Sequence, residues 1–129
     1  MIVLDTDACV DVLRGTPRAK QVTAAVGDEP VAVSAVTVHE LAEGARRARR
    51  PDQERAAVDR FLSAFDVLPL DVPTAWISGS IAGDLARSGA PIGDLDTLIA
   101  ASALHAGCPL LTFNSKHFGR VPGLAIVEP

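Results

Sequence analysis

Four carboxylates stand where the sequence pattern places the end of a strand or the start of a helix. Asp5 follows the apolar run 2–4, Glu40 lies early in a helical stretch, and Asp94 and Asp96 open a later one. If these side chains converge at one edge of a sheet, they repel one another unless a cation lies among them. Mg²⁺ or Mn²⁺ prefers oxygen ligands and keeps several waters, so a few carboxylates are enough. We therefore expect a cation site that could activate water against a phosphodiester.

Each acid also has a purely structural explanation. Asp5 could cap the helix that follows the first strand, because an N-cap aspartate accepts a backbone N–H. Thr37 and Glu40 have the spacing of a capping box. Asp94 is a good N-cap candidate. Asp94 and Asp96 point in different directions on a helix and lie about equally far from its apolar stripe, so spacing does not choose between them.

The elements that must position these acids alternate along the chain. We expect buried or edge strands at residues 2–4, 30–34, 66–70, 108–113 and 124–128. We expect helices at residues 35–49, 51–65, 73–89 and 94–107. Strands separated by helices predict one α/β domain over residues 1–129, a three-layer α/β/α sandwich with a mainly parallel central sheet.

The composition is typical of a globular protein. Hydrophobic residues make up 48% of the 129 residues and charged residues 22%, which argues against disorder. The chain has no apolar run long enough for a membrane span and no signal-peptide pattern. Two cysteines without ligand spacing indicate neither a disulfide framework nor a zinc site, and favour the reducing cytoplasm.

The formal net charge of −4 counts against a plain nucleic-acid binder, but basic residues are concentrated locally. Arg46, Arg47, Arg49 and Arg50 lie together in "ARRARR", and we call them the arginine cluster. The cluster could contact RNA phosphates. It could equally be the solvated end of a helix, where arginine is favoured by the helix dipole.

The chain resembles the PIN-domain ribonucleases, specifically the VapC toxin branch of the type II toxin–antitoxin systems. The matching stretches are "MIVLDTDACVDVLRG", "VAVSAVTVHELAEGA", "DVLPLD" and "APIGDLDTLIAASALHAGCPLLTFNSKHFGRVPGL". The resemblance implies a PIN-like fold in which Asp5, Glu40 and Asp96 are the catalytic, metal-binding acids. The family pattern "PIG-x-x-D-x-x-I-A-A" selects Asp96 and leaves Asp94 auxiliary. It also implies a Mg²⁺-dependent (or Mn²⁺-dependent) endoribonuclease that cleaves RNA, forms a homodimer and is inhibited by a cognate VapB-type antitoxin.

The sequence departs from the family after the last core strand. Many PIN domains carry a fourth acid there, whereas this chain has Asn114 and His117 and no carboxylate between Thr112 and Arg120. For this reason we expect a second metal to bind weakly, or only when RNA is present. Thr6 and Asn114 are candidates for orienting the ligands, and we expect His117 to be a surface residue.

Two other functions are compatible with part of the pattern. A phosphatase of the haloacid dehalogenase type would use Asp5 of "VLDTDACV" as nucleophile and Asp7 as acid/base. A PIN fold that only binds RNA or protein would explain the missing acid. For the dimer, the helix 73–89 offers Trp76 and Ile77 as contacts, unless both are buried in the monomer core.

Overall fold

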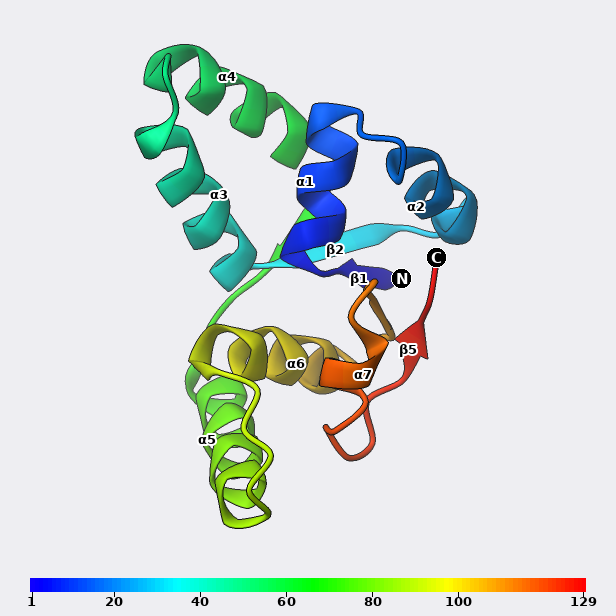
Figure 1. Ribbon diagram of the computed structural model, residues 1–129, viewed down its shortest axis with the longest axis vertical. Coiled ribbons are helices and arrows are strands. Elements are labelled where there is room, and N and C mark those ends of the chain that lie inside the picture. Colours follow the sequence, from blue (N-terminus) through cyan, green and yellow to red (C-terminus); the bar gives the residue numbers. More distant parts are fainter.

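Five short parallel strands form the central sheet of the computed structural model, which describes residues 1–129 (Figure 1). Their order across the sheet is β3-β2-β1-β4-β5, and every neighbouring pair is parallel. The strands are β1 (Ile2–Leu4), β2 (Val31–Ser34), β3 (Asp66–Leu68), β4 (Leu110–Leu111) and β5 (Ile126–Val127). Because β1 lies in the middle, Val3 pairs with Ala32 on one side and with Leu110 on the other.

Seven helices cover the two faces of this sheet. On one face lie α1 (Thr6–Arg14), α2 (Ala19–Val26), α3 (Ala35–Arg47) and α4 (Pro51–Leu62). On the other lie α5 (Val72–Arg87), α6 (Asp94–Ala106) and α7 (Ser115–Phe118) (Figure 1). The predicted three-layer sandwich with a parallel sheet is therefore confirmed. No helix is both long and apolar enough to cross a membrane.

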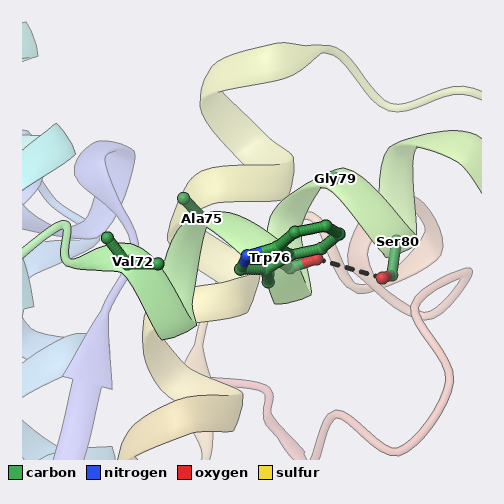
Figure 2. Close-up of a pocket in the computed structure, with 5 residues that line it drawn as sticks. All are labelled: Val72, Ala75, Trp76, Gly79 and Ser80. Carbon is green, nitrogen blue, oxygen red and sulfur yellow. Dashed lines mark hydrogen bonds between the residues drawn. The ribbon is translucent and has the colours of Figure 1, made fainter.

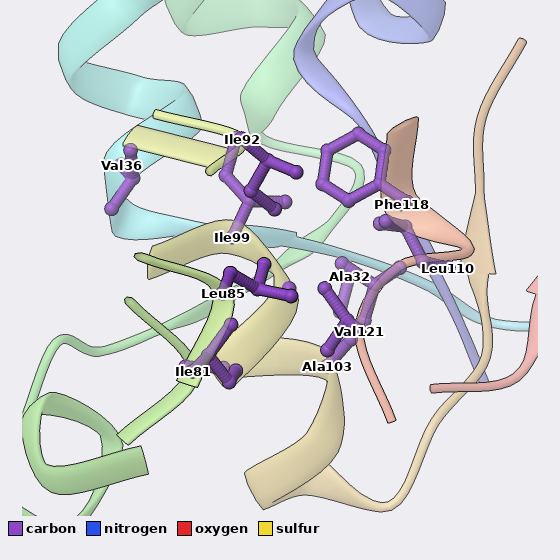
Figure 3. Packing of buried hydrophobic residues seen from close by; sticks show 13 residues of the cluster. Ala32, Val36, Ile81, Leu85, Ile92, Ile99, Ala103, Leu110, Phe118 and Val121 are labelled. Carbon is purple, nitrogen blue, oxygen red and sulfur yellow. The ribbon is translucent and has the colours of Figure 1, made fainter. Parts of the chain in front are cut away.

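The sheet is buried on both faces because its side chains alternate between two hydrophobic clusters. Val3, Ala32 and Leu110 pack in one cluster with residues of α5, α6 and α7, including Ile99 and Phe118 (Figure 3). The neighbouring strand residues, such as Leu4 and Leu111, pack in the other cluster against α1 to α4. Strands buried on both sides read as unbroken apolar runs, which is why β1 and β4 show no alternation in the sequence.

The boundaries differ from the prediction mainly where the chain leaves the sheet. The third strand ends at Leu68, since Pro69 has no N–H to continue the ladder. The fourth is only two residues long, and the helix expected over 51–65 ends at Leu62. Neither α2 nor α7 was predicted, because each is too short to show a clear apolar period.

Candidate active site

Asp5 lies at the end of the central strand β1 and begins α1. Its Oδ1 accepts a hydrogen bond of 2.7 Å from the backbone N–H of Thr6, so Asp5 is the N-cap of α1. Its Oδ2 accepts a hydrogen bond of 2.8 Å from the hydroxyl of Thr112, which follows β4. The residue is only 5% exposed. Asp5 is therefore the N-cap of α1, and it also places a buried carboxylate at the carboxyl edge of the sheet.

Glu40 is bound across the junction between α1 and α3 and not within its own helix. The Thr6 hydroxyl donates to Glu40 Oε1 at 2.7 Å and lies 3.0 Å from the Thr37 hydroxyl. Because the Thr6 proton is engaged by Glu40, Thr37 is the donor to Thr6. The capping-box interpretation of Thr37 and Glu40 was wrong: α3 begins earlier, and Ser34 is its N-cap.

Asp96, the third acid of the candidate site, contacts His117. His117 Nε2 lies 2.8 Å from Asp96 Oδ2 and 2.8 Å from the carbonyl oxygen of Ile92. Our expectation that His117 is a simple surface residue was wrong, because the short helix α7 carries it to the start of α6. The expected N-cap role of Asp94 was also wrong, since Gly93 occupies the cap position and Asp94 is the first helical residue.

The acids are electrostatically unfavourable to one another without a cation. Burial raises the pKa of Asp5 to about 6; the Thr112 hydrogen bond opposes this rise, and the negative charges of Asp7 and Asp96 add to it. Burial also raises the pKa of Asp96 above its ordinary value, and the hydrogen bond and charge of His117 oppose that rise. Asp7 adds to the pKa of Asp96 as well. Negative charge therefore accumulates in the site. His117 offsets this charge at Asp96 but not at Asp5.

The carboxylates do not form a ready-made ligand cluster. No three His, Cys, Asp or Glu side chains stand close enough together to hold a metal ion by themselves. The Asn114 side chain has no hydrogen-bond partner, and its backbone N–H donates to the Thr112 hydroxyl at 3.0 Å. What the structure provides is three separate acids, each held by one polar side chain: Asp5 by Thr112, Glu40 by Thr6 and Asp96 by His117.

Sequence reasoning missed Thr112 and the tertiary roles of Thr37, Asp7 and His117. Thr112 carried one usable signal: a fully buried hydroxyl directly after a core strand that neighbours β1 must find a partner at the carboxyl edge. Asp7 was considered only for the phosphatase alternative. Nothing local to His117 indicates that its partner lies 21 residues away.

The arginine cluster and Arg18 are the basic groups considered for RNA binding. The arginine cluster occupies the last turn of α3 and the turn to α4, where Arg47 makes an exposed ion pair of 3.6 Å with Glu43. Arg18 instead packs over Phe113, with its guanidinium carbon 3.5 Å from the ring centroid, and its Nε lies 3.6 Å from the Asp11 carboxylate. Phe113 directly follows Thr112, so Arg18 is a cation next to the segment that holds Asp5.

Helix α5 carries an exposed apolar face away from the acids. Trp76 is 75% exposed and Val72 is also exposed. Both line an open pocket of about 410 Å³ together with Ala75, Gly79 and Ser80, as Figure 2 shows. Ile77, by contrast, packs partly against the core. The alternative to a dimer contact was burial of both residues in the monomer core. This alternative is wrong for Trp76 and partly right for Ile77.

Comparison with known proteins places the chain and its fold in one family. A model of the PIN domain matches residues 2–124. The tRNA(fMet)-specific endonuclease VapC of Shigella flexneri is 34% identical over 122 residues, covering 95% of this chain and 92% of that protein. Ribonuclease VapC19 of Mycobacterium tuberculosis (strain H37Rv) is 36% identical over 126 residues, covering 96% and 97%.

Solved structures agree with this assignment. The crystal structure of DNA-bound VapBC from Salmonella typhimurium matches with a TM-score of 0.89 and 31% identity, covering 98% of this chain and 96% of that one. VapBC2 from Rickettsia felis, bound to a promoter DNA fragment, matches with a TM-score of 0.88, 26% identity and coverage of 100% and 99%.

This chain belongs to the PIN-domain family. Within it, the relatives of nearly equal length place the chain in the VapC branch. The family assignment also decides against the haloacid dehalogenase alternative.

Proposed function

We propose that this protein is a VapC-type endoribonuclease toxin that cleaves RNA with a divalent cation and is inhibited by a VapB-type antitoxin. The observation that carries the proposal is the buried carboxylate of Asp5 at the carboxyl edge of the sheet, with its pKa raised by burial and by Asp7 and Asp96. Relatives that match over nearly the whole chain are named ribonucleases, which supports the reaction class.

The donor set fits Mg²⁺, with Mn²⁺ as a substitute. No basic side chain pairs with Asp5, whose two hydrogen bonds come from a backbone N–H and a hydroxyl. A cation would relieve the repulsion around this buried carboxylate. The absence of a three-ligand cluster does not conflict with Mg²⁺, which binds through one or two carboxylates and otherwise keeps its waters. When bound, Mg²⁺ would supply the positive charge that activates water and stabilises the leaving oxygen.

Different residues of the chain would bind the cation, orient its ligands and attract the RNA. Glu40 Oε2 and Asp96 Oδ1, which have no protein partner, would hold the cation directly or through its waters. Both oxygens of Asp5 already accept one hydrogen bond, so Asp5 would bind through a remaining lone pair. Thr6 and Thr112 would keep the acids oriented. Asp94 and Asn114 would be auxiliary. The arginine cluster and Arg18 would attract the RNA backbone, since cations that neutralise phosphates supply most of the non-specific affinity.

Inhibition would follow from the same negative charge. An antitoxin arginine entering the site would pair with its carboxylates in a bidentate manner and compete with Mg²⁺. The solved relatives are VapBC complexes, which supports a VapB-type partner. We further propose that the toxin is a homodimer, for which the exposed Trp76 face of α5 is the best available surface.

The test is cleavage of total cellular RNA by the purified chain, with mapping of the new RNA ends. We expect cleavage with Mg²⁺ or Mn²⁺, none with EDTA, and none with the Asp96→Asn variant at the same concentration. A folded chain that binds RNA but never cuts it, with either metal, would contradict the proposal and favour a non-catalytic binding module. An antitoxin that still inhibits fully without its basic C-terminal residues would contradict the arginine mechanism alone.

A further inference from the structure

His117 is placed between two oxygen acceptors. Its Nε2 lies 2.8 Å from Asp96 Oδ2 and 2.8 Å from the carbonyl oxygen of Ile92. A carbonyl oxygen cannot donate, and neither can an ionised carboxylate. Nε2 must therefore carry a hydrogen, whatever the charge of the ring, and it shares this hydrogen between the two oxygens.

Both supports of this contact are fixed in the hydrophobic core. Ile92 is 6% exposed and Phe118, the residue after His117, is 1% exposed. Both belong to the same buried cluster, as Figure 3 shows. The His117 ring also packs edge-on against the Phe118 ring, with centroids 5.7 Å apart. The imidazole is thus held at a defined position relative to the start of α6.

Asp96, in contrast, depends on His117 for its orientation. Its side chain is 33% exposed, and its only hydrogen bond is the one from His117. Oδ2 is engaged in this bond, and Oδ1 has no protein partner. Without the imidazole, the carboxylate would be free to adopt other rotamers in the first turn of α6.

We propose that His117 is a positioning residue that fixes the Asp96 carboxylate so that Oδ1 stays available to a divalent cation. This inference rests on the proposed function, in which Asp96 binds that cation. Thr112 gives the same kind of support to Asp5 from the other end of the same short segment. The segment from Thr112 to His117 contains no carboxylate of its own, and it acts by orienting two that lie elsewhere.

Two substitutions separate the hydrogen bond from ring packing. His117→Gln places an amide N–H near the position of Nε2, whereas His117→Met has similar length and no donor. Both lose the ring contact with Phe118 equally. His105→Met is the matched control, because His105 also faces an aspartate, Asp71, but at 3.9 Å on the opposite end of α6.

The experiment measures Mn²⁺ affinity of the full-length protein by electron paramagnetic resonance, without RNA. We expect His117→Met to lose about tenfold to a hundredfold in affinity, as is typical for partners of ligating residues. We expect His117→Gln to recover most of this loss and His105→Met to match the wild type. Should the Met variant fail to fold by circular dichroism, His117→Leu is the second donor-free variant. In the metal-free wild type, NMR should show a slowly exchanging Nε2–H.

Equal Mn²⁺ affinity in the wild type and in His117→Met would overturn the inference, as would equal weakening by Gln and Met. A wild type that binds Mn²⁺ with the expected variant pattern but cleaves no RNA would support the positioning role and overturn the proposed activity. A wild type that binds no Mn²⁺ would overturn both.

Discussion

Replacing Asp5 with asparagine should stabilise the metal-free protein, although it should destroy the proposed site. The pKa of Asp5 is about 6 in the folded chain against an ordinary value of 3.8. At 1.36 kcal/mol per unit, keeping Asp5 ionised near pH 7.5 costs the folded state about 3 kcal/mol. Asparagine removes this cost. It also disturbs the Thr112 hydroxyl, which donates to Asp5 and accepts from the Asn114 N–H, at a cost of about 1 kcal/mol. The expected net gain is about 2 kcal/mol.

The sign of the pH dependence gives a second check. A carboxyl whose pKa is raised by folding binds more protons in the folded state, so wild-type stability falls as pH rises from about 4 to about 6. The advantage of Asp5→Asn should therefore be largest near neutral pH and vanish near pH 4. Urea unfolding in EDTA, followed by far-UV circular dichroism, measures both. Fluorescence is the poorer probe, because the single tryptophan is largely exposed in the folded chain.

Asp71 is a matched control, since it is also an N-cap aspartate but an exposed one. The hydrogen bonds from the Thr74 hydroxyl and N–H lower the pKa of Asp71. Its contribution is present above the ordinary aspartate pKa and is lost on acidification, so Asp71→Asn should reduce stability near neutral pH. Two results would refute the assignment of a buried carboxylate with a raised pKa. One is an Asp5→Asn variant less stable than the wild type near pH 7.5 in EDTA, and the other is a gain in stability that is the same near pH 4 as near pH 7.5.

Three further outcomes follow from the site and the surface. Asp96→Asn should abolish RNA cleavage, whereas Asp94→Asn should leave most of the cleavage activity. Because Asp94 is not the N-cap, its substitution should cost less than about 1 kcal/mol of stability. The reverse ranking of the two variants would show that the wrong aspartate was chosen. Glutamine at all four positions of the arginine cluster should weaken RNA binding and reduce the salt slope by about 0.7 for each phosphate contact removed. Arg18→Gln tests the arginine that packs over Phe113 in the same titration. An unchanged slope for the cluster variant would show that the cluster is only a solvated helix end. Trp76→Ser should convert the proposed dimer to a monomer by light scattering at micromolar concentration, and a wild type that is already monomeric would contradict the dimer.

Local features of the fold could be predicted from the sequence. The prediction failed where a side chain bonds to a distant segment and not to a residue near it in the chain. An unbroken apolar run followed by Asp5 was enough to place that carboxylate at the end of a buried strand. The spacing of Thr37 and Glu40 favoured a bond within one helix, yet Thr6, 34 residues away, is the partner of Glu40. His117 looked like a surface residue because the contact with Asp96 exists only once α7 reaches the start of α6. Tertiary contacts of this kind leave no periodic signal in a single sequence.

The hydrogen bond between Asp5 and Thr112 has a consequence for the synthesis of the protein. Its partner Thr112 follows it by 107 residues, and β4, which places Thr112, is a direct neighbour of β1. Ribosomes add about 5–20 residues each second, so about 5 to 20 seconds separate the two halves of this contact as the chain emerges. During that interval β1 can pair with β2 but not with β4, and the carboxylate at its end remains unsupported. A protein proposed to attack RNA would therefore lack the complete support of its Asp5 carboxylate until the segment that carries Thr112 has been made.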